Sequence, residues 1–165
     1  MVRGRRFGRS SGSAYDVTVA RLGDLDQLVE HRLGMWRDIH PELENEIAGT
    51  RGHTRSWIRE KLSKGELVGF VARTSDKRVA GSGCIWLREE QPRPDNPLRV
   101  VPYLMSMYTE KEFRRRGVAK AVLEEALNWT RAHNHRRIVL HASDEGRHLY
   151  EEYGFGPTHE MRLDL

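Results

Sequence analysis

The sequence predicts a single mixed α/β domain, and three observations support this fold class. The chain has 165 residues, a length that suits one domain rather than two. Hydrophobic residues make up 38% of it, enough for a domain of this size to bury a core. The C-terminal half runs in the order strand, charged loop, helix, strand, which is typical of α/β folds.

The first 14 residues differ in composition from the rest of the chain. Residues 1–14 are rich in Gly, Ser and Arg and contain no long apolar run, so we expect a flexible basic tail and no secretory signal. The formal net charge is +4, and this segment alone carries four arginines and no acid. The predicted domain, residues 15–165, is therefore close to neutral, which argues against a nucleic-acid-binding face.

Hydrophobic spacing predicts the first elements of the domain. Residues 17–19 indicate a short strand. Apolar residues recur every three or four positions over residues 24–39, which predicts a helix. His40-Pro41 should end it, because the residue before a proline is pushed out of the helical region. A second helix is predicted over residues 54–64.

Three β-rich runs follow. Residues 67–74 and 79–87 are separated by a short turn and predict a hairpin. Residues 100–109 come after a proline-containing loop and predict a third strand. No uncharged apolar stretch in the sequence is long enough to cross a bilayer, so no membrane association is expected.

The C-terminal part contains the strongest helix prediction, over residues 117–133. Its apolar face consists of Val118, Val122, Ala126 and Trp129. A short strand at 138–142, a short helix at 146–153 and a last strand at 158–163 complete the expected order.

A run of three arginines precedes the strongest helix, in the sequence Arg114-Arg115-Arg116-Gly117-Val118-Ala119. The first N–H groups of a helix lack intrahelical partners and carry partial positive charge, so a diphosphate fits there. Gly117 would let a ligand approach the backbone closely, and the arginines raise the local potential. Taken alone, this R-x-x-G-x-A pattern also fits a solvated basic loop at the start of a helix.

A second motif, Leu149-Tyr150-x-x-x-Gly154-Phe155, follows the next strand. Together the two motifs resemble the Q/R-x-x-G-x-G/A and L-Y-x-x-x-G-F signatures of the GNAT superfamily of acyl-CoA N-acyltransferases. The order of elements agrees over about residues 17–163. The resemblance implies a mixed, mostly antiparallel sheet flanked by helices, with splayed central strands.

The resemblance also implies how acetyl-CoA is bound. Pantetheine would pair with the open edge of the 100–109 strand at Met107 and Thr109, and the Met107 amide would stabilise the developing oxyanion. Backbone amides of residues 115–120 would hold the diphosphate, and Arg114 opens the signature. The implied cofactor-binding residues are Met107, Thr109, Arg114, Arg115, Arg116, Gly117, Val118, Ala119, Lys120 and Ser143. Ser143 stands where many members carry Asn.

Tyr150 matches the tyrosine that protonates the departing CoA thiolate in this family. A phenol with a pKa near 10 can donate a proton to such a thiolate. The alternative is that Tyr150 is a core aromatic of a short helix, which is our interpretation of Tyr153.

No general base is assigned. Some protein-acetylating relatives carry Glu where this chain has Tyr103. The acceptor side is expected to include His31, His40, Glu42, Glu44 and Glu46, each interpreted as a solvated helix or loop residue. His133 and His135 are interpreted as helix-end residues, because no zinc-like ligand spacing occurs and no metal is expected. The lone cysteine, Cys84, excludes an internal disulfide, is interpreted as a small strand hydrophobe, and favours a cytoplasmic location.

The expected activity is transfer of an acetyl group from acetyl-CoA to a primary amine by direct attack in a ternary complex. Two alternatives remain open. One is a protein N-terminal or lysine acetyltransferase. The other is a non-catalytic acyl-CoA-binding or regulatory module whose basic tail contacts nucleic acid. The acceptor pocket should be shaped by the first two helices and the 88–99 loop, but no motif there names the amine. The resemblance favours a homodimer over a monomer.

Overall fold

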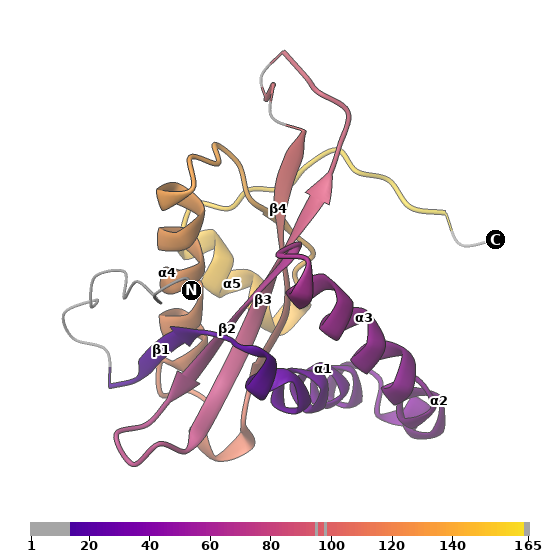
Figure 1. The fold of residues 1–165 in the computed structure, drawn as a ribbon, viewed down its shortest axis with the longest axis vertical. Coiled ribbons are helices and arrows are strands. Elements are labelled where there is room, and N and C mark those ends of the chain that lie inside the picture. The colour runs from indigo at the N-terminus through magenta and orange to yellow at the C-terminus, as the bar shows by residue number, and fades with distance from the viewer. Residues whose placement is uncertain (1–13, 95, 98, 164–165) are drawn as a thin grey trace.

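A five-stranded sheet separates two layers of helices in the computed structural model, which describes residues 14–94, 96–97 and 99–163 (Figure 1). The strand order is β1-β2-β3-β4-β5. The first four strands pair antiparallel with their neighbours, and β5 runs parallel to β4. The predicted mixed, mostly antiparallel sheet is thereby confirmed. The basic tail predicted for residues 1–14 lies outside the described residues except for its last position.

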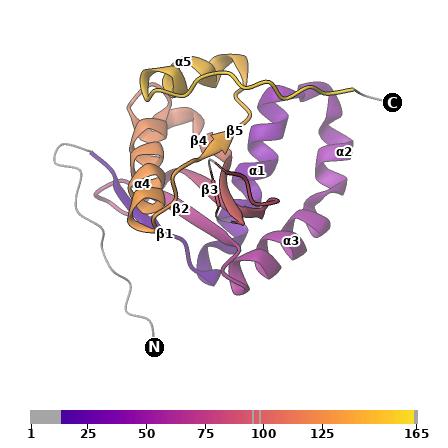
Figure 2. The same cartoon turned by 90° about the horizontal axis from the view of Figure 1, so that it is seen from above.

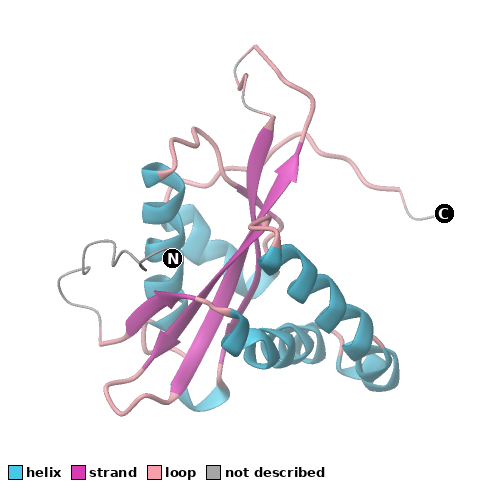
Figure 3. Cartoon of the chain, in the orientation of Figure 1, coloured by secondary structure: helices cyan, strands magenta, loops and turns pink. Residues whose placement is uncertain are grey.

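The elements keep the predicted order with one addition and one loss (Figure 3). The strands are β1 (Asp16–Val19), β2 (Leu67–Arg73), β3 (Val79–Glu89), β4 (Val100–Thr109) and β5 (Val139–Leu140). The helices are α1 (Leu25–Ile39), α2 (Glu44–Gly49), α3 (Arg51–Ser63), α4 (Val118–Ala132) and α5 (Asp144–Glu152). Single 3₁₀ turns occupy Leu22–Asp24, Pro41–Leu43 and Lys111–Phe113.

Each face of the sheet packs on its own set of helices (Figure 2). One hydrophobic cluster joins the sheet to α4 and includes Phe70, Ile85, Leu104 and Leu123. The other joins the opposite face to α1 and α3 and includes Leu28, Leu33, Val71 and Ile58. The strands contribute apolar side chains to both clusters, because successive side chains of a strand point to opposite faces of the sheet.

The first helix follows its predicted apolar stripe only for three turns. Leu25, Leu28, Val29 and Leu33 are buried. Trp36 and Ile39, predicted on the same stripe, are 36% and 44% exposed, because the end of α1 extends past the sheet. His40 ends the helix with a φ of −132°, as the following Pro41 predicts.

The helix α2 was missed by the sequence analysis. Its six residues contain one buried apolar side chain, Ile47, so no periodic pattern marks it. The prediction of α3 also began late, at residue 54 instead of Arg51.

The last predicted strand, at residues 158–163, is wrong. This segment has no regular secondary structure and leaves the body of the fold (Figure 1). Its apolar side chains Met161 and Leu163 are 94% and 81% exposed. Since β5 has only two paired residues, it offers a short edge, and a strand added there would bury too little to be held.

Candidate active site

The strand β4 contains a bulge at the position expected for acyl transfer. In its pairing with β3, Ser82 lies opposite Tyr108 and Cys84 lies opposite Met105. Three steps along β4 therefore match two steps along β3, which places one extra residue at Ser106–Met107. Ser106 has a φ of +54°, a left-handed conformation uncommon for a residue with a side chain.

The strand β4 and the edge strand β5 separate just before this bulge, after Leu104. Pairing between β4 and β5 is confined to Tyr103 with Val139 and Leu104 with Leu140. The C-terminal half of β4 therefore has no strand partner on its β5 side among the described residues. Met107 and Thr109 lie on this open edge, where an extended ligand can pair with the backbone as an added strand does.

The arginine-rich loop leads from β4 into α4 at the opposite end of the strand from the 90–99 loop (Figure 1). Gly117 precedes the first residue of α4 and has a φ of +82°, which favours glycine. A Cβ added at Gly117 would meet nothing within 4 Å. The start of α4 is thus open to solvent, and its first amides can receive an anion.

The three arginines of this loop have different surroundings. The Arg114 guanidinium pairs with Asp38 on α1 and donates from Nε to the Thr109 carbonyl at 3.1 Å. It also lies 5.7 Å from the centre of the Tyr108 ring. Arg114 therefore holds the loop against α1 and β4. Arg115, Arg116 and Lys120 are exposed beside the helix start, whereas the Val118 side chain is buried in the core.

The short helix α5 carries the predicted proton donor. Tyr150 packs on the α4 cluster and against Phe155, with ring centres 5.8 Å apart. Burial raises the pKa of Tyr150 to about 12, so its hydroxyl stays protonated at neutral pH. The Tyr153 hydroxyl instead donates to Glu124 Oε1 at 2.6 Å, which agrees with a structural part for Tyr153. Ser143 caps α5 by accepting from the Gly146 amide at 3.2 Å.

Aromatic and basic side chains surround the first half of β4 on the α1–α3 face. The rings of Trp57, Trp86 and Tyr103 follow one another edge to face. The Tyr103 hydroxyl lies 2.5 Å from Nδ1 of His141, whose Nε2 is 3.4 Å from Glu160. No signal in the sequence indicates that His141 and Tyr103 are partners, because 38 residues separate them.

The interpretation of His31 as solvated is wrong. Its side chain is 1% exposed, with Nδ1 2.7 Å from Ser82 Oγ and Nε2 3.0 Å from Glu110 Oε1. The ring packs on Tyr108, with centres 4.9 Å apart. Polarity alone suggested solvation, but His31 lies on the sheet-facing side of α1, where these polar partners make burial tolerable.

The remaining candidate residues agree with their interpretations. The glutamates at positions 42, 44 and 46 are exposed. Cys84 is buried, and burial raises the pKa of its thiol to about 12. His133 stacks on Trp129 and its Nδ1 lies 2.8 Å from the Trp129 carbonyl oxygen at the end of α4. The described residues contain no cluster of His, Cys, Asp or Glu able to hold a metal. Nor does any helix among them have the length and apolar character to span a membrane.

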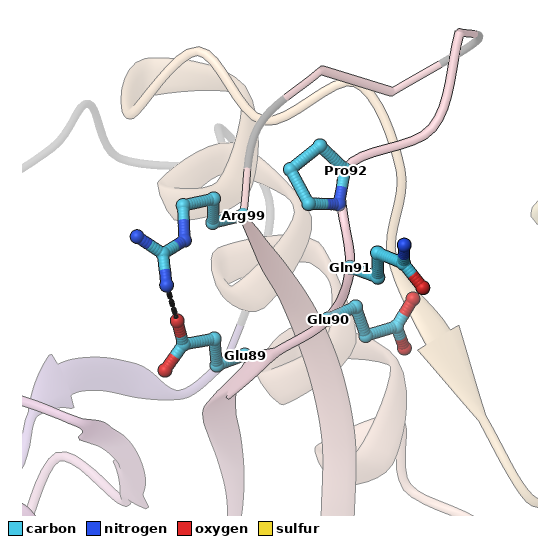
Figure 4. Close-up of a pocket in the computed structure, with 5 residues that line it drawn as sticks. All are labelled: Glu89, Glu90, Gln91, Pro92 and Arg99. Atoms are coloured by element: carbon cyan, nitrogen blue, oxygen red, sulfur yellow. Dashed lines mark hydrogen bonds and ion pairs between the residues drawn. The ribbon is translucent and has the colours of Figure 1, made fainter.

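A surface hollow of about 630 Å³ lies at the far end of the β3–β4 hairpin (Figure 4). It is lined by Glu89, Glu90, Gln91, Pro92 and Arg99, and Glu89 pairs with Arg99 across its floor. Ten residues of β4 separate it from the arginine-rich loop, roughly 30 Å of extended chain. This hollow is therefore distant from the start of α4.

An open strand edge, a bulge and an exposed helix start have the geometry that an extended phosphorylated ligand would need. These features fit an acyl-CoA, whose pantetheine can follow β4 to the start of α4. The chain belongs to the acetyltransferase (GNAT) family, whose model matches residues 25–155. It is therefore an acetyltransferase.

Solved structures agree with this family. A GCN5-related N-acetyltransferase from Ralstonia eutropha JMP134 is 24% identical, with a TM-score of 0.83 over 92% of this chain and 98% of that one. A predicted acetyltransferase from Clostridium acetobutylicum, solved with acetyl-CoA, is 25% identical, with a TM-score of 0.77 over 92% of this chain and 95% of that one. A ribosomal-protein-alanine N-acetyltransferase from Brucella melitensis biovar Abortus 2308 shares the fold at 17% identity, with a TM-score of 0.65 over 92% and 99%. The search of curated proteins gave no match.

Proposed function

We propose that this protein transfers an acetyl group from acetyl-CoA to the primary amine of an acceptor, by direct attack in a ternary complex. The observation that carries the proposal is the bulge at Ser106–Met107, on an open strand edge that leads straight to the N-terminus of α4. A similar chain, the Clostridium acetobutylicum acetyltransferase, was solved with acetyl-CoA, which supports acetyl-CoA as the donor.

The donor is held by backbone groups more than by side chains. Met107 and Thr109 on the edge of β4 would pair with pantetheine. Amides at the start of α4, from Arg115 to Lys120, would hold the diphosphate, with the exposed cations adding attraction. Ser143 already accepts from the Gly146 amide, which leaves its hydroxyl hydrogen and one oxygen lone pair to contact the donor.

The reaction forms a bond between the amine nitrogen and the acetyl carbonyl carbon and breaks the bond from that carbon to sulfur. The Met107 amide would stabilise negative charge on the carbonyl oxygen. The Tyr150 hydroxyl would give its proton to the departing thiolate, and the amine would release its own proton to a base or to water. Tyr150 suits this role, because burial keeps its hydroxyl protonated until a thiolate forms.

Direct attack is favoured over a covalent acyl-enzyme. A cysteine nucleophile must ionise, and the buried Cys84 has a thiol pKa of about 12. Its side chain lies in the hydrophobic cluster under α1 and α3. The acetyl group would then pass from donor to acceptor without resting on the protein.

A panel of amines tests the proposal, with acetyl-CoA as donor and free thiol as the readout. The panel includes small amines, polyamines, lysine-containing peptides and peptides with free N-termini, so protein acetylation is tested in the same experiment. We expect amine-dependent thiol release and an acetylated product by mass spectrometry. Binding of acetyl-CoA without release on any amine would instead support the non-catalytic module.

The assembly and the location stay predictions. Sedimentation equilibrium should show a homodimer, and a tagged chain should fractionate with the cytoplasm.

A further inference from the structure

Arg32 on α1 reaches the bulge of β4 from the helical face of the sheet. Its Nη1 donates to Ser106 Oγ at 3.0 Å, and Ser106 is only 8% exposed. The guanidinium carbon also lies 5.8 Å from the centre of the Trp36 ring. Gly34 brings the helix close enough for this contact, because a Cβ there would lie 2.9 Å from the Tyr108 ring.

Arg32 has no acidic partner among the described residues, in contrast to its neighbours. On the same helical layer, Arg37 pairs with Glu44 and Arg55 pairs with Asp26. Burial lowers the pKa of Arg32. The groups that raise this pKa are Cys84 and Tyr103, and neither is a carboxylate. The guanidinium remains charged at neutral pH. A cation partly withdrawn from water without a counter-ion is costly, and a bound anion offsets that cost.

The position of this cation relates it to the acceptor. Ser106 is the residue before Met107, whose amide faces the acyl carbonyl in the proposed function. Arg32 approaches from the α1–α3 face, where Tyr103 and Trp86 also lie, and not from the α4 face. One Nη1 hydrogen serves Ser106, which leaves several of the five guanidinium donors for a carboxylate.

We propose that Arg32 binds a carboxylate on the acceptor, so that the substrate is a small amino acid whose amine and carboxylate are a few bonds apart. The inference rests on the proposed acetyl transfer and names its acceptor class. Holding the carboxylate beside Ser106 fixes the amine near the carbonyl carbon, which raises its effective concentration there. The same cation could instead receive the distal carboxylate of a dicarboxylic acyl group on the donor, and the experiment separates the two sources.

Matched acceptors test the carboxylate directly. L-Alanine is compared with ethylamine, L-phenylalanine with phenethylamine and L-lysine with cadaverine, all with acetyl-CoA. We expect kcat/KM to be about 10- to 100-fold higher for the amino acid of at least one pair, the range of a charge-assisted hydrogen bond. Arg32→Gln should abolish that preference mainly through KM, and Arg32→Lys should restore part of it.

The control is Arg37→Gln on the same helix, which removes a guanidinium already paired with Glu44 and should leave the preference unchanged. Calorimetric binding of the amino acids to the CoA-bound protein gives a readout that needs no turnover, and Arg32→Gln should weaken it by a similar factor.

Amines acetylated without any carboxylate preference, or amino acids that bind equally to wild type and Arg32→Gln, would overturn the inference and leave the acetyl transfer standing. Thiol release from succinyl-CoA with ethylamine, lost in Arg32→Gln, would assign the cation to the donor and also overturn it. Failure to bind acetyl-CoA would contradict the proposed function itself, whereas loss of Arg32-dependent amino-acid binding alone would not.

Discussion

At the scale of single residues, two tyrosines of one short helix differ in what their hydroxyls can do. Tyr153 donates to Glu124, whereas the Tyr150 hydroxyl has no hydrogen-bond partner among the described residues. Burial raises the pKa of Tyr150 to about 12, and burial together with the Glu124 carboxylate raises the pKa of Tyr153 to about 12, so both hydroxyls are protonated at neutral pH. Of the two, only the Tyr150 hydroxyl can therefore donate to a ligand without breaking an existing hydrogen bond.

Tyr150→Phe should therefore lose turnover and keep donor affinity. The ring still packs on Phe155, so the fold and acetyl-CoA binding persist, and only the proton for the thiolate is removed. The expected loss is about 10²–10⁴-fold in kcat, because the interaction matures in the transition state. Tyr153→Phe is the matched control and should keep turnover while unfolding about 1 kcal/mol more easily. Equal turnover of wild type and Tyr150→Phe would make Tyr150 a core aromatic.

In the free protein, the positive φ at position 117 favours glycine, and no neighbouring atom would contact a side chain there. A side chain at this position would collide only with a bound ligand. Gly117→Val should weaken acetyl-CoA binding in calorimetry, because its Cβ branches project from the start of α4 toward the proposed diphosphate. Valine at a φ of +82° also costs about 1–2 kcal/mol of stability. Gly65→Val is the control: Gly65 has a φ of +69° and open space around it, beyond the end of α3. It should lose similar stability and no affinity, and unchanged binding by Gly117→Val would count against the site.

The buried His31 side chain should make the free energy of unfolding depend on pH. Burial lowers the pKa of His31 below its ordinary value near 6.5, despite the nearby carboxylates of Glu110 and Glu30. Below pH 6.5 the unfolded chain therefore binds the proton more readily than the folded one. The stability contributed by neutral His31 is full above pH 6.5 and is lost as the pH falls through its folded pKa. Urea midpoints should fall between pH 7 and 5 less steeply in His31→Gln than in wild type, and His148→Gln, at an 84% exposed position, should match wild type.

The residues that the sequence could identify are those with a local signal. Gly117 and Tyr150 stand in short motifs, so their elements and spacing were predictable. Besides neighbours on α1, His31 and Arg32 have partners 51 to 79 residues away, on β3, on β4 and just after it, and these distant partners leave no signal in the local sequence. No spacing within α1 distinguishes a polar residue that faces the sheet from one that faces water.

At the scale of elements, a local signal was enough to predict the helix α4 but not enough to predict whether the last strand forms. The α4 face predicted from Val118, Val122, Ala126 and Trp129 is buried throughout, because a long apolar stripe on a helix is stable only when it packs against a core, here the sheet. A strand needs a partner edge as well as a suitable sequence. The pattern at 158–163 is suitable, but β5 supplies only two residues of edge, which the sequence does not reveal.

Two leucine truncations measure this difference. Leu33 is 0% exposed in the α1 cluster, and Leu33→Ala should lower the free energy of unfolding by about 2–5 kcal/mol. Leu163 is 81% exposed, and Leu163→Ala should change it by less than about 0.5 kcal/mol. Urea denaturation of both variants compares the same substitution at two sites. A loss at Leu163 as large as that at Leu33 would show that the last strand forms in solution.

At the scale of the whole molecule, the strand β4 lies between the two helical layers and would carry the proposed donor site. Its bulge lies on the edge that β5 leaves open, and the loop after it leads to the start of α4. Arg114 ties the loop after β4 to Asp38 on α1, so both layers fix the geometry of this region. A ligand lying along the edge would therefore contact the part of the fold on which both hydrophobic clusters converge.

Acetyl-CoA should in consequence stabilise the folded protein as a unit. At a concentration a hundredfold above its dissociation constant, a ligand that binds only the folded state adds about 2.7 kcal/mol. For a chain of 165 residues this corresponds to a rise in Tm of roughly 5–11 °C. Adenosine, which lacks the diphosphate and pantetheine, is the control ligand and should give little shift, and Gly117→Val should require more acetyl-CoA for the same shift. An unchanged Tm with acetyl-CoA, or an equal shift with adenosine, would show that the strand edge and the start of α4 do not bind the donor together.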